Sequence, residues 1–108
     1  MITWNDFEKI DIRIGTIISA NAFPKAKKPA YQLTIDFGEF GVKSSSAQIT
    51  ELYQLADLPG KQVAAVVNFP PRRIADFSSE CLVLGVYSSD GVVLLQPDRQ
   101  VEKGGKVG

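Results

Sequence analysis

The sequence predicts an all-β fold, a small five-stranded Greek-key barrel of the OB type. Several short stretches alternate apolar and polar residues with a period of two, which is typical of half-buried strands. The Asp-Gly step at 90–91 is a strong signal for a tight hairpin. The chain of 108 residues is too short for two independent cores, and closing the sheet would hide its strand edges. An SH3-like or split barrel is the alternative architecture.

The chain opens with a capping pattern and then changes to a strand pattern. Thr3 precedes Asp6 at the spacing of a capping box, so we expect an N-terminal helix of about two turns. From Ile12 the period becomes two, and Gly15 within this stretch indicates a bulge or a tight bend. After a loop rich in lysine and proline at 21–29, two further strands are expected at 31–37 and 42–47.

The second half of the chain begins with helical spacing. Ile49, Leu52 and Leu58 recur at this spacing before Pro59-Gly60, so we predict a helix between the third and fourth strands. The apolar residues of the two terminal segments, 1–10 and 97–108, must be covered, either by the barrel of the same chain or by a twofold-related copy. Strands are expected at 63–69, 81–87 and 92–96, within one domain spanning 1–108 whose terminal segments, 1–10 and 97–108, lie outside the barrel.

The counts of histidine and cysteine exclude several kinds of catalytic and metal site. The chain has no histidine and one cysteine, Cys81, which excludes a Ser-His-Asp or Cys-His pair, a Cys/His zinc site and an internal disulfide. A lone cysteine is typical of a reducing compartment, and neither a bilayer-spanning run nor a secretory signal is visible. We therefore expect a cytoplasmic binding protein that is not an enzyme, with no cofactor, no metal and no membrane insertion.

Basic residues gather in the middle of a chain whose formal net charge is zero. One cluster, Lys25, Lys27 and Lys28, lies in the loop predicted after the first strand, and we interpret it as a solvated surface. The other cluster is Arg72-Arg73, directly after Pro70-Pro71. This distribution favours a local patch, rather than the whole surface, for any binding of nucleic acid.

The segment from Asn68 to Arg73 is the leading candidate for a binding site. A buried strand ends just before the two prolines, which stiffen the loop that follows and lower the cost of ordering it on binding. Guanidinium groups bind phosphate oxygens and stack on bases. Two alternatives stay open: Arg72 and Arg73 pair with Asp76 or Glu80, or Asn68 orients the turn instead of contacting a ligand.

Further candidates lie on neighbouring segments. We expect Glu80 to position one of the arginines, and we expect Ser45 to point opposite to the serines on either side of it. The candidates for RNA or polypeptide contact are Asn68, Arg72, Arg73, Ser79, Glu80, Lys43, Ser45 and Ser46. The candidates for apolar contact are Phe40, Phe69 and Phe77, of which Phe77 can instead anchor its loop in the core.

Several motifs resemble those of the tRNA-binding domain family, which includes an appendage of some methionyl-tRNA synthetases. The stretch 11–17 (DIRIGTI) resembles the opening motif of the family, 23–26 (FPKA) resembles its loop motif, and 36–38 (DFG) matches a D-x-G motif. The segments 44–50 (SSSAQIT) and 68–74 (NFPPRRI) are most similar to the CsaA subgroup of export-related chaperones. The similarity extends over nearly the whole chain.

The resemblance implies an OB-fold homodimer that binds tRNA through the basic loop patch and binds unfolded or pre-secretory polypeptides through apolar pockets. It also implies the export machinery as a further partner. A second hypothesis is a tRNA-binding accessory module that docks on an aminoacyl-tRNA synthetase. The third is an enzyme that uses Asp36, Asp76 or Glu80, but the sequence supplies no nucleophile with an adjacent base and no glycine-rich phosphate loop for it.

Overall fold

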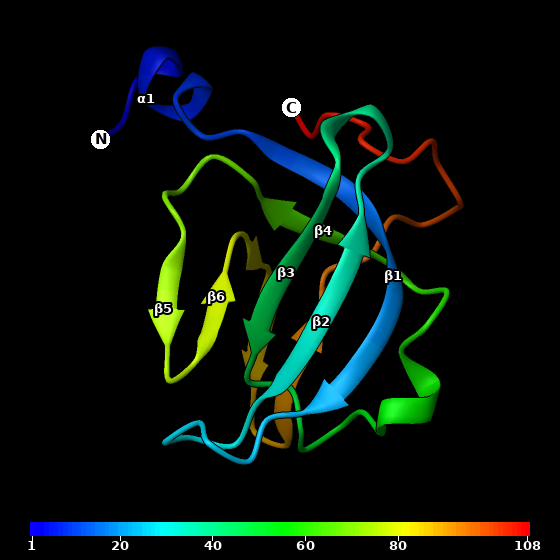
Figure 1. The fold of residues 1–108 in the computed structure, drawn as a ribbon. Helices are drawn as coiled ribbons and strands as arrows, with labels where there is room; N and C mark the ends of the chain where they lie inside the picture. Colours follow the sequence, from blue (N-terminus) through cyan, green and yellow to red (C-terminus); the bar gives the residue numbers. More distant parts are fainter.

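The computed structural model describes all residues, 1–108, and contains a nearly closed five-stranded antiparallel barrel (Figure 1). The five-stranded sheet has the order β3-β2-β1-β4-β7, and two hairpins, β5–β6 and β8–β9, extend from it. This arrangement confirms the predicted all-β OB-type barrel. The elements are α1 (Trp4–Glu8), β1 (Ile12–Ala22), β2 (Tyr31–Asp36), η1 (Gly38–Phe40), β3 (Val42–Ala47), η2 (Leu55–Asp57), β4 (Gln62–Val66), β5 (Arg72–Ile74), β6 (Phe77–Ser79), β7 (Leu82–Val83), β8 (Gly85–Ser88) and β9 (Gly91–Leu94).

The long strand β1 serves both halves of the barrel. Its first half pairs with β4 and its second half pairs with β2, with a register shift between Ile17 and Ser19. The sequence predicted a bulge or a tight bend at Gly15, but the bulge lies further along the strand, between Ile17 and Ser19. Gly15 has a different role, because a Cβ there would lie 2.5 Å from Ile35 Cγ2 and 2.7 Å from the Phe37 ring. The glycine lets β1 approach the side chains of β2.

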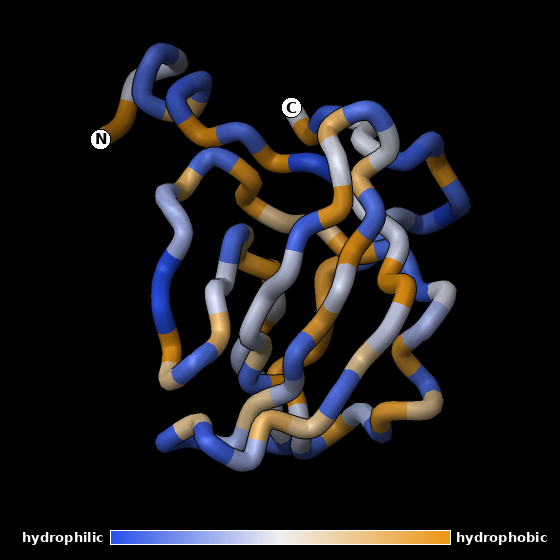
Figure 2. The backbone as a smooth tube through the Cα atoms, in the orientation of Figure 1, coloured by the Kyte–Doolittle hydropathy of each residue, from blue (hydrophilic) through white to orange (hydrophobic).

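The core lies inside the barrel and follows the alternation of β2. Leu33, Ile35 and Phe37 are fully buried, and the residues between them face outward or are half-buried. Figure 2 shows this alternation as bands of hydropathy along β2. From β4, Val63 and Ala65 complete the same cluster. The period of two seen in the sequence is thus the period of core-facing side chains.

The segment between β3 and β4 is less helical than predicted. It holds a single turn of 3₁₀ helix, η2, where the apolar spacing indicated a helix over 49–58. Ile49 and Leu58 are buried from the two ends of this segment. Tyr53 is held between them, because its carbonyl accepts a hydrogen bond from Tyr31 Oη at 2.8 Å and its own hydroxyl accepts one from the Leu94 N–H at 3.0 Å. These tertiary contacts outweigh local helix propensity.

The strands of the second half are shorter than predicted, and one hairpin was not predicted. β4 ends at Val66 rather than at Phe69, and the strand expected at 81–87 is divided into β7 and β8. The segment after Pro71, expected to be a loop, forms the β5–β6 hairpin, in which Ala75 turns with a φ of 53°. Three residues per strand give too short an alternation to be recognised in a sequence.

The two terminal segments behave differently. The C-terminal segment runs beside β1, where the Ile14 N–H donates to the Gly105 carbonyl at 2.9 Å and the Val107 N–H donates to the Ile12 carbonyl at 2.8 Å. Lys103 Nζ adds an ion pair with Asp36 at 3.0 Å. This segment therefore covers the barrel of its own chain.

The N-terminal helix α1 stands away from the barrel (Figure 1). It is capped as predicted, by reciprocal hydrogen bonds between Thr3 and Asp6, but none of its residues is buried. The side chains of Ile2 and Trp4 are largely exposed, with Trp4 at 81%. With five residues, this one α-helix is far too short to span a membrane, and no other helix of the fold is long and apolar enough to do so.

Candidate binding groove

A groove of about 840 Å³ opens between the β5–β6 hairpin and the barrel, and we call it the hairpin groove. The groove is lined by the end of β3 and by β7, which we call its floor, by the hairpin and the Phe69–Pro71 segment that leads into it, and by β8. Half of its lining residues are hydrophobic. They are Ser46, Ala47, Gln48, Ile49, Phe69, Pro70, Pro71, Arg72, Arg73, Ile74, Ser79, Glu80, Cys81, Leu82, Val83, Gly85, Tyr87 and Val92.

The hairpin is attached to the barrel at its base by serines. The Ser46 N–H donates to Ser79 Oγ at 3.0 Å, and Ser44 Oγ donates to the Ser78 carbonyl at 2.6 Å. Ser45 points the other way, as predicted: it is fully buried and donates to the Cys81 carbonyl at 2.9 Å. Of the three consecutive serines of β3, only Ser46 lines the hairpin groove. The serines of β3 therefore mainly attach the hairpin to the barrel.

Glu80 does not position an arginine, contrary to the prediction. Its Oε1 accepts hydrogen bonds from both the N–H and the Oγ of Ser44, each at 2.9 Å. These bonds favour the ionised carboxylate and lower the pKa of Glu80. The charge of Lys43 lowers this pKa further, but Lys43 lies outside the groove. The Glu80 charge is thus held at the edge of the barrel by β3.

Arg72 and Arg73 are exposed and form no ion pair within the chain. The alternative that they pair with Asp76 or Glu80 is wrong. Asp76 instead pairs with Lys25 at 3.0 Å, which is the main cause of its lowered pKa, and Arg73 lowers that pKa only as the smallest contributor. Both arginines therefore line the hairpin groove without an internal carboxylate partner.

Asn68 lies outside the groove and ties down the start of the chain. Its Oδ1 accepts a hydrogen bond from the Asp11 N–H at 3.0 Å, and its Nδ2 donates to the Lys9 carbonyl at 2.8 Å. Both ends of the amide are used in this way. Of the two roles considered for Asn68, the structure shows the orienting one, and it fixes the segment between α1 and β1.

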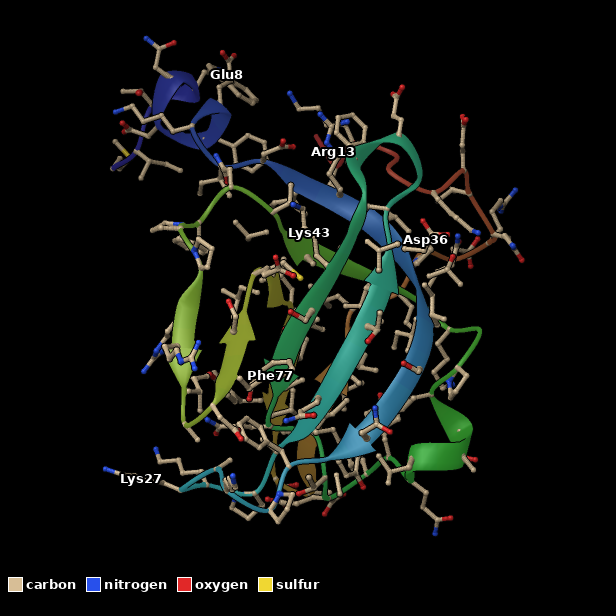
Figure 3. The ribbon with its side chains drawn as sticks, in the orientation of Figure 1. Glu8, Arg13, Lys27, Asp36, Lys43 and Phe77 are labelled. Atoms are coloured by element: carbon tan, nitrogen blue, oxygen red, sulfur yellow. The ribbon has the colours of Figure 1, made fainter.

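The three candidate phenylalanines lie in three different environments. Phe69 lines the groove and is 56% exposed. Phe77 packs against Phe23, with ring centroids 5.4 Å apart, so it anchors the hairpin tip beside the loop that carries Lys27 (Figure 3). Phe40 lies outside the groove, with the guanidinium of Arg13 4.0 Å above its ring centroid.

Sequence reasoning missed Tyr87, which lines the groove and is 91% exposed. Its place in an apolar run suggested a core residue. Leu82, about half exposed, was missed for the same reason. The signal that distinguishes Tyr87 is its position at the end of β8, next to the polar hairpin turn at 88–91.

Cys81 forms part of the groove floor and is a poor nucleophile. Its side chain is buried, and this burial raises the pKa of the thiol to about 11. The thiol therefore stays protonated near neutral pH, and a protonated thiol is neither a nucleophile nor a metal ligand. No group of three or more His, Cys, Asp or Glu residues in the structure is placed to hold a metal ion.

Comparisons with known proteins identify the family of this chain. Residues 12–106 match the family model described as "Putative tRNA binding domain". A methionine–tRNA ligase of Methanococcoides burtonii is 41% identical over 105 residues, which are 96% of this chain and 15% of that protein. One of Bacteroides fragilis is 35% identical over 107 residues, which are 98% of this chain and 16% of that protein. The chain thus spans about 15% of the length of the curated relatives it matches.

Two solved structures resemble the whole chain. The CsaA chaperone protein of Picrophilus torridus is 55% identical, with a TM-score of 0.96 and complete coverage of both chains. The chaperone CsaA of Bacillus anthracis is 52% identical, with a TM-score of 0.94, covering 100% of this chain and 99% of that one. The chain belongs to the tRNA-binding domain family, and within it the fold and sequence are similar to those of the CsaA chaperones.

Proposed function

We propose that this chain is a binding protein that holds tRNA at the hairpin groove, with Arg72 and Arg73 contacting phosphate oxygens. The observation that carries the proposal is the pair of exposed guanidinium groups that have no carboxylate partner in the chain. Guanidinium forks match the geometry of phosphate oxygens, and a hairpin fastened at both ends loses little conformational freedom on binding. Membership of the tRNA-binding domain family supports the same ligand.

Binding, rather than catalysis, fits the chemistry of the groove. Its one thiol is held protonated by burial, and its one carboxylate, Glu80, is held ionised by Ser44. Neither group is poised near neutral pH for proton transfer. We place the protein in the cytoplasm, where tRNA is found.

The test is a titration of tRNA into the wild-type protein and the variant Arg72→Ala/Arg73→Ala, followed by fluorescence anisotropy. We expect the variant to lose about tenfold or more in affinity at low salt and to reduce the slope of log affinity against log salt by roughly 1.5 to 2. The control is Arg99→Ala/Lys106→Ala, which removes two exposed cations outside the groove. Equal losses in the two variants would refute the assignment of the site.

We propose unfolded polypeptide as a second ligand, held by apolar contact. The floor of the hairpin groove includes Ile49, Leu82 and Val83, and the two similar solved structures are of proteins named as chaperones. Apolar binding depends little on screening by salt. An unfolded polypeptide should therefore bind with similar affinity at low and high salt, and Arg72→Ala/Arg73→Ala should weaken its binding far less than that of tRNA.

We also propose that the functional unit is a homodimer in which a second copy covers α1. Ile2, just before α1, and Trp4, its first residue, are both exposed, and the chain itself leaves the helix uncovered. A twofold arrangement would double the number of hairpin grooves on one particle and raise its avidity for a large ligand. Sedimentation velocity should show a dimer for the wild-type chain and a monomer for Ile2→Ser/Trp4→Ser.

The alternative is an accessory module that docks on an aminoacyl-tRNA synthetase. The observation in its favour is that the matched region is 15% of the length of a methionine–tRNA ligase. In this case the purified chain should bind a purified synthetase directly and should show no affinity for unfolded polypeptide. Binding to polypeptide without binding to the synthetase would instead favour a chaperone that acts by itself, with the export machinery as the receiver of its clients.

A further inference from the structure

We infer that the hairpin groove accepts unpaired nucleotides, whose bases stack on Tyr87 and Phe69 while Arg72 and Arg73 bind the adjoining phosphates. This inference rests on the proposed binding of tRNA and specifies which part of the molecule enters the groove. It predicts a preference for single-stranded segments over paired stems.

The first step is the exposure of two aromatic rings in one groove. Tyr87 is 91% exposed and Phe69 is 56% exposed, although both line the same cavity of about 840 Å³. The hydroxyl of Tyr87 forms no hydrogen bond within the chain, and neither ring pairs with another aromatic ring. Phe37, by contrast, is fully buried, and Phe77 packs against the buried Phe23. The faces of these two rings are therefore available to a flat ligand.

The second step is the sign of the charge beside the rings. The cations lining the groove are Arg72 and Arg73, and the single anion is Glu80, which is occupied by Ser44. A ligand that uses both the arginines and the rings presents an anion and an apolar flat surface together. A nucleotide carries both, at a spacing fixed by its sugar, whereas an apolar polypeptide segment has no anion to offer the arginines.

The third step is the state of the nucleic acid. In a duplex, both faces of each base are covered by neighbouring bases, so a protein side chain reaches only base edges and backbone. Exposed rings can stack only on bases that have left the helical stack. A cavity of this volume is of the size that takes small ligands, about 300–1,000 Å³. The arrangement thus favours nucleotides from a loop or a chain end.

One further side chain can contact a base in this position. Gln48 lines the groove, is exposed, and its amide makes no hydrogen bond within the chain. An amide carries both donors and an acceptor, which suits the hydrogen-bonding edge of an unpaired base. We therefore assign Gln48 a contact with the edge of the stacked base.

The test compares two RNA probes, a single-stranded hexanucleotide of uridine and adenosine and a fully paired stem of matched charge. The hexanucleotide should bind and should displace labelled tRNA, and the stem should do so only at much higher concentration. Tyr87→Ala should weaken hexanucleotide binding about 5- to 150-fold, the range for loss of one stacked base, and Tyr87→Phe should keep most of the affinity. Because the Tyr87 side chain is almost fully exposed, neither change should alter the melting temperature.

The outcomes separate this inference from the proposed function. If Tyr87→Ala binds both RNA probes like wild type while Arg72→Ala/Arg73→Ala loses tRNA, the stacking site is refuted and tRNA binding stands. If the paired stem binds as tightly as the hexanucleotide at the same salt, the preference for unpaired nucleotides is refuted. If neither RNA probe nor tRNA binds and an unfolded polypeptide does, both the inference and the proposed tRNA function are refuted.

Discussion

Lys25 Nζ lies 3.0 Å from Asp76 Oδ2, and this ion pair joins the loop after β1 to the tip of the β5–β6 hairpin. Beside it, Phe23 and Phe77 are packed with their ring centroids 5.4 Å apart. The hairpin is thus held at its tip by an ion pair and a ring contact, and at its base by the serines of β3. The arginines of β5 project from a segment that is fixed at both ends.

Asp76→Asn should strengthen the binding of tRNA. The substitution removes the carboxylate that Lys25 now pairs with, and it leaves the hairpin tip with one more net positive charge near Arg73. We expect an increase in affinity of about two- to fivefold at low salt, which fades as salt screens the charges. Anisotropy titrations at two salt concentrations measure it.

Asp57→Asn is the control for this change, because it removes an exposed carboxylate of η2 that lies outside the groove. The pair of Lys25 and Asp76 is itself largely exposed, so Asp76→Asn should leave the thermal midpoint almost unchanged. A fall in tRNA affinity for Asp76→Asn would mean that holding the tip in place matters more than the added charge.

The barrel could be predicted from the sequence because its strands carry their own signal. Along β2, the alternation of Leu33, Ile35 and Phe37 with polar residues is long enough to fix both the element and its buried face. The capping box of Thr3 and Asp6 is equally local, and it too was predictable. Features encoded within a few neighbouring residues are the ones that a sequence reveals.

The groove could be predicted only in part, because its partners are far apart in the chain. That Glu80 bonds to Ser44, and Asp76 to Lys25, depends on which strands and loops become neighbours in the closed barrel. The exposure of Tyr87 likewise depends on β8 leaving the barrel sheet to pair with β9 alone. No local sequence pattern shows which distant segments become neighbours. Several groove residues could therefore be predicted as candidates, but their bonding partners could not.

Glu80→Gln should flatten the dependence of stability on acid pH. The pKa of Glu80 is lowered in the folded state by the two hydrogen bonds from Ser44, so its carboxylate stabilises the fold above its ordinary pKa of 4.5. That contribution is lost as the pH falls through the lower, folded-state pKa. Urea unfolding at about pH 6 and about pH 3.5 should show a smaller difference in free energy for the variant than for wild type.

At the higher pH, Glu80→Gln should cost about 1 kcal/mol, since a charge-assisted hydrogen bond becomes a neutral one. Glu102→Gln is the matched control, because the Glu102 side chain is exposed and forms no ion pair. The free energy of unfolding of the two variants is compared at both pH values. If it falls by the same amount in Glu80→Gln as in Glu102→Gln, the hydrogen bonds from Ser44 do not contribute to stability.

Gly15→Ala should destabilise the fold by about 1–3 kcal/mol or more, as overpacking of a core does. The added Cβ would lie 2.5 Å from Ile35 Cγ2 and 2.7 Å from the Phe37 ring, and both of these side chains are fully buried and cannot move aside. Gly108→Ala, where a Cβ meets nothing within 4 Å, should be neutral. Urea denaturation of the two variants compares them, and equal stability would show that β1 can shift away from β2.

Cys81 should resist thiol reagents in the folded protein. Burial raises the pKa of its thiol to about 11 from an ordinary value of 9.0, so at pH 8 about 0.1% is thiolate, the form that reacts. Labelling with Ellman's reagent should therefore be slow in buffer and fast in denaturing urea. The same shift makes stability fall as the pH rises above about 9, because only the unfolded chain then releases the proton. Rapid labelling in buffer would contradict this expectation and would show that the floor of the hairpin groove opens.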